Sequence, residues 1–320
     1  MSDHLAVISI GTNSTRVLLA DVRDDRAHIA LGRSIGTRLG ESLGENGALG
    51  DEPMERTLEA IRVHLRAVRG HYLKLFTIAT SAVRRASNRD AFGNAVERIA
   101  GVPLRVLSGE EEATASYRGA ISSLPEEHDA VTGVVDVGGG STEYAVGTGK
   151  LPERTLSLEI GAVRLTEALP QLAGANGFVD AESLAQAGSI ARERLAPLRE
   201  MGAATRVVLV GGSATGAATM LRGRRTRFDH FEVSRSDLQR SLIRLCTLDI
   251  DGRRRIEGVK AQRADILPAG IIVLETVLEL LGQERATVSS ADLLLGFLLE
   301  QQDAMASARH SNVAGRWWNR

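Results

Sequence analysis

The hydrophobic pattern of the first 124 residues predicts a sheet that starts with three strands and continues with alternating helices and strands. Short apolar runs bounded by polar turns are typical of strands, and apolar residues repeated every three or four positions are typical of helices. The predicted strands span residues 5–10, 16–22, 26–35, 75–80 and 103–107, and the predicted helices span 55–69, 90–99 and 109–123. Residues 125–129 are polar without a regular period, which predicts a junction.

The same order of elements begins again after the junction. The predicted strands span residues 131–137, 143–147, 154–159, 207–210 and 286–288, and the predicted helices span 163–169, 180–200, 236–246, 264–281 and 292–302, with a helix of small residues after Ser213. The longest apolar stretch contains Pro268 and two glutamates, so it is not a membrane span. Residues 312–320 are expected to form a frayed tail, although Trp317 and Trp318 offer an anchor.

An internal repeat is the most informative feature of the chain. Residues 9–16 (SIGTNSTR) align with residues 136–143 (DVGGGSTE), 127 residues later, and each copy forms a tight turn between the first two strands of its half. Two glycine- and serine-rich turns can resemble each other by chance, but the repeated strands around them favour a duplication. We therefore expect two similar α/β lobes that present similar loops across a cleft.

These two loops have the composition of phosphate-binding turns. Glycine lets backbone N–H groups approach an anion closely, and serine, threonine and asparagine add donors. An ordinary hairpin turn would use the same residue types, but a pair of such loops favours phosphate. The candidate phosphate-binding residues are Gly11, Thr12, Asn13, Ser14, Gly138, Gly139, Gly140 and Ser141.

Two carboxylates flank the second loop. Asp136 ends one predicted strand and Glu143 starts the next. One or two carboxylates, together with water and substrate oxygens, are the usual ligands of Mg²⁺. We therefore expect Asp136 and Glu143 to hold Mg²⁺, with Mn²⁺ as the alternative cation. The dipeptides at 128–129 and 229–230 also combine His with Asp, but neither has a partner cluster, and we interpret both as loop residues.

Three consecutive glutamates open the predicted helix at 109–123. Ser108 and Glu111 have the spacing of a capping box, and acidic residues in a first turn favour the helix dipole. This explanation accounts well for Glu111, partly for Glu110 and least for Glu112. A carboxylate at position 112 that points into the cleft would orient and deprotonate a water molecule. Arg84 follows a buried strand, where a guanidinium would neutralise charge during phosphoryl transfer.

The overall charge limits the classes of partner. The chain has 39 Lys+Arg against 40 Asp+Glu, which argues against a protein that coats nucleic acid. A single cysteine, Cys246, excludes an internal disulfide framework and a Cys-rich zinc site. The first residues lack a signal-peptide pattern. We therefore expect a cytoplasmic protein with no nucleic-acid or membrane partner, and leave a homodimer open.

The basic residues are almost all of one kind. Only three are lysines, so 36 are arginines. A G+C-rich genome produces such a bias, and arginine is also better suited than lysine to two-pronged binding of phosphate. Composition does not separate these explanations. The clusters at 84–85, 222–227 and 253–255 would extend an anion-binding groove if they line the cleft, whereas solvated loops are their ordinary fate.

Taken together, the motifs resemble those of the exopolyphosphatase and guanosine pentaphosphate phosphohydrolase family, within the actin–hexokinase–Hsp70 superfamily. The resemblance covers most of the chain, and its specificity lies in the order of the motifs. They occupy residues 10–14, 79–88, 108–113, 136–143, 157–167, 210–215, 263–270 and 288–296.

The resemblance implies two ribonuclease-H-like lobes with the site between them. The N-terminal lobe would comprise residues 1–124 and the last helix, at about 291–307, the C-terminal lobe residues 125–290, and the tail 308–320. By motif position, Glu112 corresponds to the water-activating glutamate, Asp136 and Glu143 to the magnesium ligands and Arg84 to a phosphate-contacting arginine. The implied substrates are inorganic polyphosphate or, as an alternative, guanosine pentaphosphate.

One position departs from the family pattern. Ser9 stands where the family usually has aspartate, which predicts weaker Mg²⁺ binding with activity retained. Longer relatives carry a further helical domain that this sequence lacks, so a grip on long chains is not implied. Two other functions stay open: a superfamily kinase, suggested by the glycine-rich stretch at 211–213, and a non-catalytic sensor of polyphosphate or nucleotide, suggested by Ser9.

Overall fold

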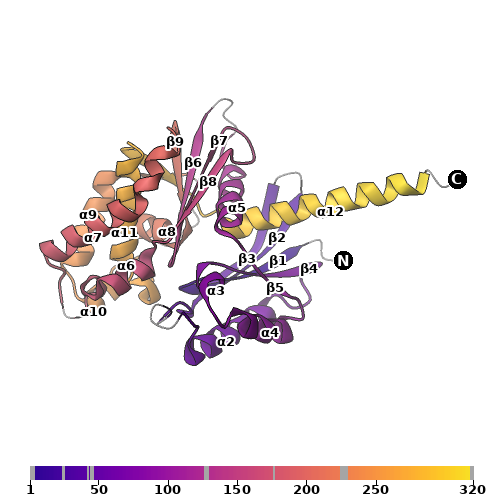
Figure 1. Cartoon of the computed structure of the whole chain (residues 1–320), viewed down its shortest axis with the longest axis horizontal. Helices are drawn as coiled ribbons and strands as arrows, with labels where there is room; N and C mark the ends of the chain where they lie inside the picture. Colours follow the sequence, from indigo (N-terminus) through magenta and orange to yellow (C-terminus); the bar gives the residue numbers. More distant parts are fainter. Residues whose placement is uncertain are drawn as a thin grey trace.

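The computed structural model describes residues 4–23, 26–41, 43, 47–125, 130–175, 177–223 and 230–317. It contains two α/β lobes, each built on one sheet, and helix α12 (Leu293–Trp317) extends away from them (Figure 1). The predicted two-lobe α/β architecture is therefore confirmed.

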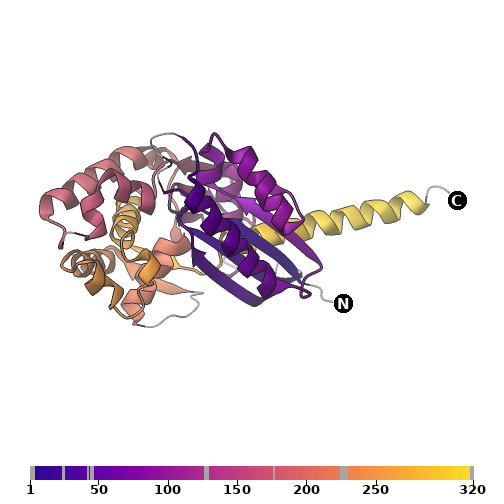
Figure 2. The ribbon, with the colours of Figure 1, turned by 90° about the horizontal axis from the view of Figure 1, so that it is seen from below.

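The first lobe has a five-stranded sheet in the order β3-β2-β1-β4-β5. Its strands are β1 (Leu5–Ile10), β2 (Ser14–Arg23), β3 (Arg26–Gly36), β4 (Lys74–Ala79) and β5 (Leu104–Val106). Side chains alternate between the two faces of a strand, and β1 is buried on both: Ala6, Ile8 and Ile10 face one core, while Leu5 and Val7 face another. Helices α2 (Asp51–Val68) and α4 (Arg89–Ala100) cover the first of these faces (Figure 2).

The second lobe has a six-stranded sheet in the order β10-β11-β9-β6-β7-β8. Its strands are β6 (Thr132–Val137), β7 (Thr142–Gly147), β8 (Arg154–Leu158), β9 (Arg206–Val210), β10 (Phe231–Ser234) and β11 (Arg285–Val288). On one face lie α6 (Ala162–Ala168), α7 (Ala181–Leu195), α8 (Gly211–Arg222), α9 (Arg235–Cys246), α10 (Ile250–Arg254) and α11 (Leu267–Leu280). The nearly continuous apolar sequence of α11 fits its place in the middle of this layer, where it is buried on most sides.

The two sheets share one topology, except that the second has an extra edge strand, β10, antiparallel to β11. In each, three antiparallel strands are followed by two strands that pair in parallel, β1-β4-β5 in the first lobe and β6-β9-β11 in the second. The pairing is also equivalent at residue level, because Ser9 lies opposite Arg16 and Asp136 lies opposite Glu143. The repeat found in the sequence is thus a repeat of fold and register.

Helix α5 (Gly109–Ile121) joins the lobes. Its buried residues Ala113, Tyr117 and Ala120 pack on the second sheet, and α12 lies along it. A Cβ atom added to Gly296 would lie 1.8 Å from the carbonyl oxygen of Ala115, and one added to Gly119 would lie 2.2 Å from that of Asp292. The two helices therefore touch backbone to backbone, which only glycine permits.

The structure corrects several boundaries predicted from the sequence. Residues 312–317 were expected to fray, but α12 continues to Trp317; Trp318 lies outside the described residues. The predicted helix at 180–200 divides into α7 and a 3₁₀ turn at 196–200. Helix α3 (Ser81–Arg85), helix α10 and strand β10 were not predicted, because elements of four or five residues are too short to show a period.

The predicted arginine clusters have different fates. Arg253 is fully buried and donates to the carbonyl oxygens of Leu245 and Leu172, each at 2.7 Å, so it ties loops of the second lobe together rather than lining a groove. Residues 224–229, which include three arginines of the 222–227 cluster, lie outside the described residues, as do His128 and Asp129. Within the described ranges, no helix is both long and apolar enough to cross a bilayer.

Candidate active site

The two repeated loops have the same backbone geometry. The Gly11 N–H donates to the Ser14 carbonyl at 3.0 Å, and the Gly138 N–H donates to the Ser141 carbonyl at 3.0 Å. Each turn directly follows the central strand of its sheet, β1 or β6. The sheets therefore place two matching turns at corresponding positions in the two lobes.

Neighbouring segments bind the carbonyl groups of both loops. In the first loop, Asn13 O accepts from two N–H groups of residues 37–38, each at 3.0 Å, and Thr12 O accepts from the Gly40 N–H at 2.9 Å. In the second, the start of α6 donates to Gly138 O at 3.0 Å and to Gly139 O at 2.9 Å. With their carbonyl groups anchored in this way, the loops keep their N–H groups available for a ligand.

Several donors of these loops have no protein partner. Among the described residues, no acceptor is found for the backbone N–H groups of Thr12, Asn13, Gly139 and Gly140. The side-chain amide of Asn13 is 4% exposed, and neither its oxygen nor its nitrogen is hydrogen-bonded. Buried polar groups without partners are costly and uncommon in proteins. Their concentration here indicates a site built for a ligand rich in hydrogen-bond acceptors.

The loops face each other across the interlobe boundary. A Cβ atom added to Gly139 would lie 3.1 Å from the Thr12 side chain, and one added to Gly140 would lie 2.8 Å from both Thr12 Oγ1 and Ser81 Oγ. The absence of side chains at Gly139 and Gly140 thus allows close approach. The arrangement brackets a small anion from both lobes.

Glu112 differs sharply from the two glutamates before it. Glu110 is exposed, and Glu111 completes a capping box in which its N–H donates to Ser108 Oγ at 3.1 Å and its carboxylate accepts from the Ser108 N–H at 2.7 Å. Glu112 is 5% exposed, and Arg84 donates to its carboxylate. Burial raises the pKa of Glu112 to about 7, although the charge of Arg84 opposes this rise.

Asp136 and Glu143 project from paired positions of β6 and β7. Burial raises the pKa of Asp136 to about 6, and burial together with the charges of Glu112 and Asp136 raises the pKa of Glu143 well above its ordinary value. Ser116 donates to Asp136 at 2.8 Å, and Ser157 donates to Glu143 at 3.0 Å. Two buried carboxylates, Glu112 and Glu143, and the partly buried Asp136 thus interact unfavourably, which a bound cation would relieve.

The donor set fits a hard cation such as Mg²⁺, because it consists of carboxylate oxygens. Within the described ranges, however, no three Asp, Glu, His or Cys side chains converge closely enough to form a complete metal site. Two carboxylates would therefore need water or substrate oxygens to complete the coordination, as Mg²⁺ commonly does.

In the first lobe, the positions equivalent to Asp136 and Glu143 are occupied by Ser9 and Arg16, which have no carboxylate. Opposite Ser9, Arg16 donates to the buried carboxylate of Asp292 at 2.6 Å. Arg263 donates to Ser14 Oγ at 3.2 Å, and its positive charge, like that of Arg16, acts on Asp136. Fixed guanidinium groups therefore lie near the carboxylates, on the side of Ser9.

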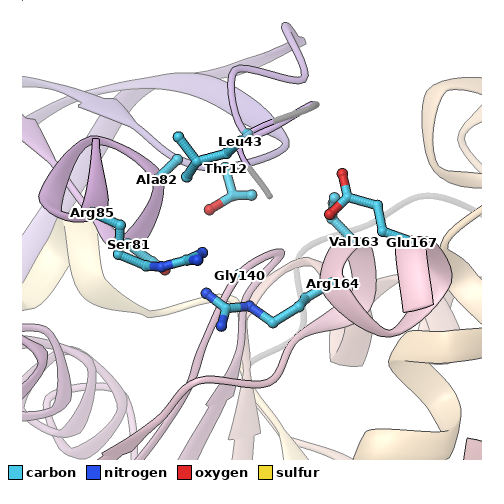
Figure 3. Close-up of a pocket in the computed structure, with 10 residues that line it drawn as sticks. Thr12, Leu43, Ser81, Ala82, Arg85, Gly140, Val163, Arg164 and Glu167 are labelled. Carbon is cyan, nitrogen blue, oxygen red and sulfur yellow. The ribbon is translucent and has the colours of Figure 1, made fainter. Parts of the chain in front are cut away.

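Two cavities adjoin these residues. One, of about 110 Å³, is lined by both lobes and includes Thr12, Ser81 and Gly140 (Figure 3). The other, of about 460 Å³, is also lined by both lobes and includes Gly212 and Arg263. The small cavity lies beside both loops, and the large one has room for a bulkier group.

The candidates chosen from the sequence lie together, but with one unexpected contact. The two loops, Asp136, Glu143 and Glu112 surround one interlobe region. Arg84 was expected to contact phosphate; here its guanidinium is held by Glu112 and by the Leu107 carbonyl at 2.9 Å.

Sequence reasoning did not single out several residues of this region. Ser116 lies one helical turn after Glu112, so helical spacing could have identified it. Arg16 occupies the position of Glu143 in the repeat, which was a usable signal. Asp292 lies in the motif at 288–296, but that motif did not indicate that its side chain reaches the site from so far along the chain.

Comparisons with known proteins agree with this geometry. The model of the Ppx/GppA phosphatase family matches residues 18–304. Exopolyphosphatase 2 of Mycobacterium tuberculosis is 32% identical in an alignment 324 positions long, which covers 92% of this chain and 98% of the relative. The crystal structure of an exopolyphosphatase from Cytophaga hutchinsonii superposes with a TM-score of 0.85 at 25% identity, covering 94% of this chain and 98% of that one.

Two other relatives are longer than this chain. A guanosine-5'-triphosphate,3'-diphosphate pyrophosphatase of Vibrio vulnificus is 28% identical, over 97% of this chain and 61% of the relative. A bifunctional 3-dehydroquinate synthase/phosphatase of Fusobacterium nucleatum is 29% identical, over 92% of this chain and 46% of the relative. The chain thus spans about half to three fifths of these two proteins.

Proposed function

The chain belongs to the Ppx/GppA phosphatase family, and we propose that it hydrolyses the terminal phosphoanhydride bond of inorganic polyphosphate, releasing orthophosphate. One observation carries the proposal: two matching loops with unpartnered N–H groups face each other beside a buried glutamate whose pKa lies near neutrality. The loops supply donors for a phosphate group and Glu112 supplies a base. The similarity to exopolyphosphatase 2 over nearly its whole length supports the choice of substrate.

In the proposed reaction, the loops hold the terminal phosphate and Glu112 orients a water molecule. The water oxygen forms a bond to the terminal phosphorus while the bond from that phosphorus to the bridging oxygen breaks. Glu112 takes the proton of the water, and the electrons of the broken bond stay with the shortened chain. Phosphoryl transfer depends mainly on positioning and on stabilising the charge of the equatorial oxygens, which the loop N–H groups are placed to do.

Arg84 has two roles in this proposal. Its positive charge lowers the pKa of Glu112 below the value that burial alone would give, so more of the carboxylate is ionised at neutral pH. The same guanidinium would stabilise negative charge on the phosphate that reacts next to it.

Asp136 and Glu143 are the residues that would hold Mg²⁺ or Mn²⁺. A bound divalent cation would neutralise phosphate oxygens and polarise the phosphorus centre. Their burial and raised pKa values support this assignment, because carboxylates that are brought together without a cation favour protonation. We also propose a cytoplasmic location, which the single cysteine supports.

The proposal is tested by measuring orthophosphate release from long polyphosphate, tripolyphosphate and guanosine pentaphosphate under identical conditions with added Mg²⁺. Faster release from polyphosphate is expected. A protein that binds polyphosphate tightly but releases no orthophosphate from any of the three would be a sensor, and the proposed hydrolysis would then be wrong.

A second candidate is hydrolysis of guanosine pentaphosphate with the same machinery. The cavity of about 460 Å³ favours it, because it offers space for a nucleoside beside Arg16 and Arg263. The Vibrio vulnificus relative also carries that activity in its name. A kinase is less well supported, because a buried carboxyl group whose pKa is about 7 suits a base that activates water.

A further inference from the structure

A group of charged residues lies at the small cavity, and none of them belongs to the machinery described above. Arg85 ends α3 in the first lobe, Glu159 follows β8 in the second, and Arg164 lies in α6. Glu159 Oε2 accepts from Arg164 Nη2 at 2.5 Å and forms an ion pair with Arg85 Nε at 3.6 Å. One carboxylate oxygen therefore interacts with two guanidinium groups that come from different lobes.

The two arginines point into the space between the lobes. Figure 3 shows the guanidinium groups of Arg85 and Arg164 directed toward each other, with Glu167 on the other side of the view. Their side chains are 39% and 27% exposed, so they remain reachable from solvent. Like charges repel when they converge, and burial together with the charge of Arg85 lowers the pKa of Arg164, although Glu159 and Glu167 act in the opposite direction.

The same cavity is also lined by a buried serine whose hydroxyl group forms no hydrogen bond within the described part of the chain. Ser81 is 2% exposed, and its Oγ has no hydrogen-bond partner in the described part of the chain. The cavity volume of about 110 Å³ far exceeds the ~10–15 Å³ that one water molecule requires. Two guanidinium groups and a buried hydroxyl are donors suited to a tetrahedral oxyanion.

We propose that Ser81, Arg85 and Arg164 form a second phosphate subsite, and that Glu159 occupies the two guanidinium groups until a phosphate displaces it. A phosphate carries more charge than a carboxylate and has more acceptor oxygens, so it satisfies both arginines and the hydroxyl together. The identity of the natural ligand rests on the proposed function: either the next phosphate of the substrate chain or the orthophosphate that has been released.

The test measures binding of inorganic phosphate to the full chain by titration calorimetry. The unsubstituted protein is expected to bind two phosphate ions, one at the loops and one at the subsite. Arg85→Gln and Arg164→Gln should each weaken the second binding event about tenfold. Arg240→Gln is the matched control, because Arg240 is 66% exposed and pairs with Asp237 on the surface of the second lobe.

Glu159→Gln separates a ligand site from a structural ion pair. If Glu159 competes with phosphate, its removal should tighten the second binding event by up to about fivefold. If it instead holds the arginines in place, binding should weaken. Weaker or unchanged binding in Glu159→Gln, or unchanged binding in both arginine variants, overturns the proposal. Arg164→Lys keeps the charge and serves as a second variant if Arg164→Gln does not fold.

Kinetics then distinguish the two sources of phosphate. A higher KM for tripolyphosphate in Arg164→Gln assigns the subsite to the substrate chain. Weaker inhibition by orthophosphate with an unchanged KM assigns it to the released product. Should the protein hydrolyse neither polyphosphate nor guanosine pentaphosphate, the proposed function fails, while loss of the second phosphate ion in the arginine variants still supports the subsite.

Discussion

Replacing Glu112 by glutamine should remove activity and at the same time stabilise the fold at alkaline pH. Glutamine keeps the shape and an acceptor oxygen for Arg84, but it cannot take a proton from water. General-base catalysis contributes about 10²–10⁴-fold to a rate, so orthophosphate release from polyphosphate should fall at least about a hundredfold. Binding of tripolyphosphate should change little, because the phosphate loops are untouched.

The stability effect follows from the pKa of the same carboxyl group. Its pKa is about 7 in the folded protein and 4.5 for an ordinary glutamate. The folded state therefore binds a proton more tightly than the unfolded state, and stability falls as pH rises from about 4.5 to about 7. At 1.36 kcal/mol per pH unit, the loss at pH 8 is about 3 kcal/mol. The glutamine variant has no carboxyl group at this position, so its free energy of unfolding should not decrease in this way as pH rises.

Urea unfolding at pH 5 and pH 8, without divalent cations, measures the effect, and a phosphate-release assay measures the rate. The variant should match the unsubstituted protein at pH 5 and exceed its stability at pH 8. Glu110→Gln is the matched control, because Glu110 is the exposed neighbour in the same helical turn. A variant that retains more than about a tenth of the activity, or that is less stable at pH 8, would refute the reasoning.

Three further substitutions test other parts of the structure. Gly140→Ala places a Cβ atom 2.8 Å from two hydroxyl oxygens of the facing lobe, so activity should fall at least about tenfold in the phosphate-release assay. Gly149→Ala is the control and should leave activity unchanged, because its Cβ atom would meet nothing within 4 Å. Equal activities of the two variants would contradict the packing argument. Arg253→Ala leaves buried carbonyl groups without their donor and should lower the free energy of unfolding by about 2–5 kcal/mol in urea titrations. Arg254 is exposed, so Arg254→Ala should change the free energy of unfolding by less than about 0.5 kcal/mol. Similar losses in both variants would show that burial is not the cause. Ser9→Asp adds a carboxylate and should lower the Mg²⁺ concentration for half-maximal activity several-fold; an unchanged or higher requirement would place position 9 outside the metal environment.

The sequence predicted those features that depend on local pattern or on repetition. Alternation and helical spacing located every strand of the two sheets except β10, and the 127-residue repeat predicted the matching loops. The capping box explained Glu111 and thereby left Glu112 as the unexplained acid, which is the one that the structure buries. The prediction of an interlobe site followed from these elements.

Contacts between distant segments were beyond prediction. Arg16 and Asp292 each lie in a motif, but neither motif predicts that they form an ion pair. The burial of Arg253 depends on the end of α9 and a 3₁₀ turn at 170–173, which converge only in the folded second lobe. The Arg84–Glu112 pair joins two residues that the sequence placed in separate roles. Such pairings are fixed by tertiary packing, so they cannot be predicted from composition.

The glycine contact between α5 and α12 has a mechanical consequence. Because Gly119 and Gly296 bring the two backbones together without intervening side chains, the crossing can act as a fulcrum if the lobes rotate relative to each other. Glu112 lies seven residues away, about 10 Å along the helix. A rotation of about 10° at that fulcrum would sweep the carboxylate through about 2 Å. Helix α5 would then work as a lever arm, converting a slight turn of the lobes into the difference between a base that reaches its water and one that does not.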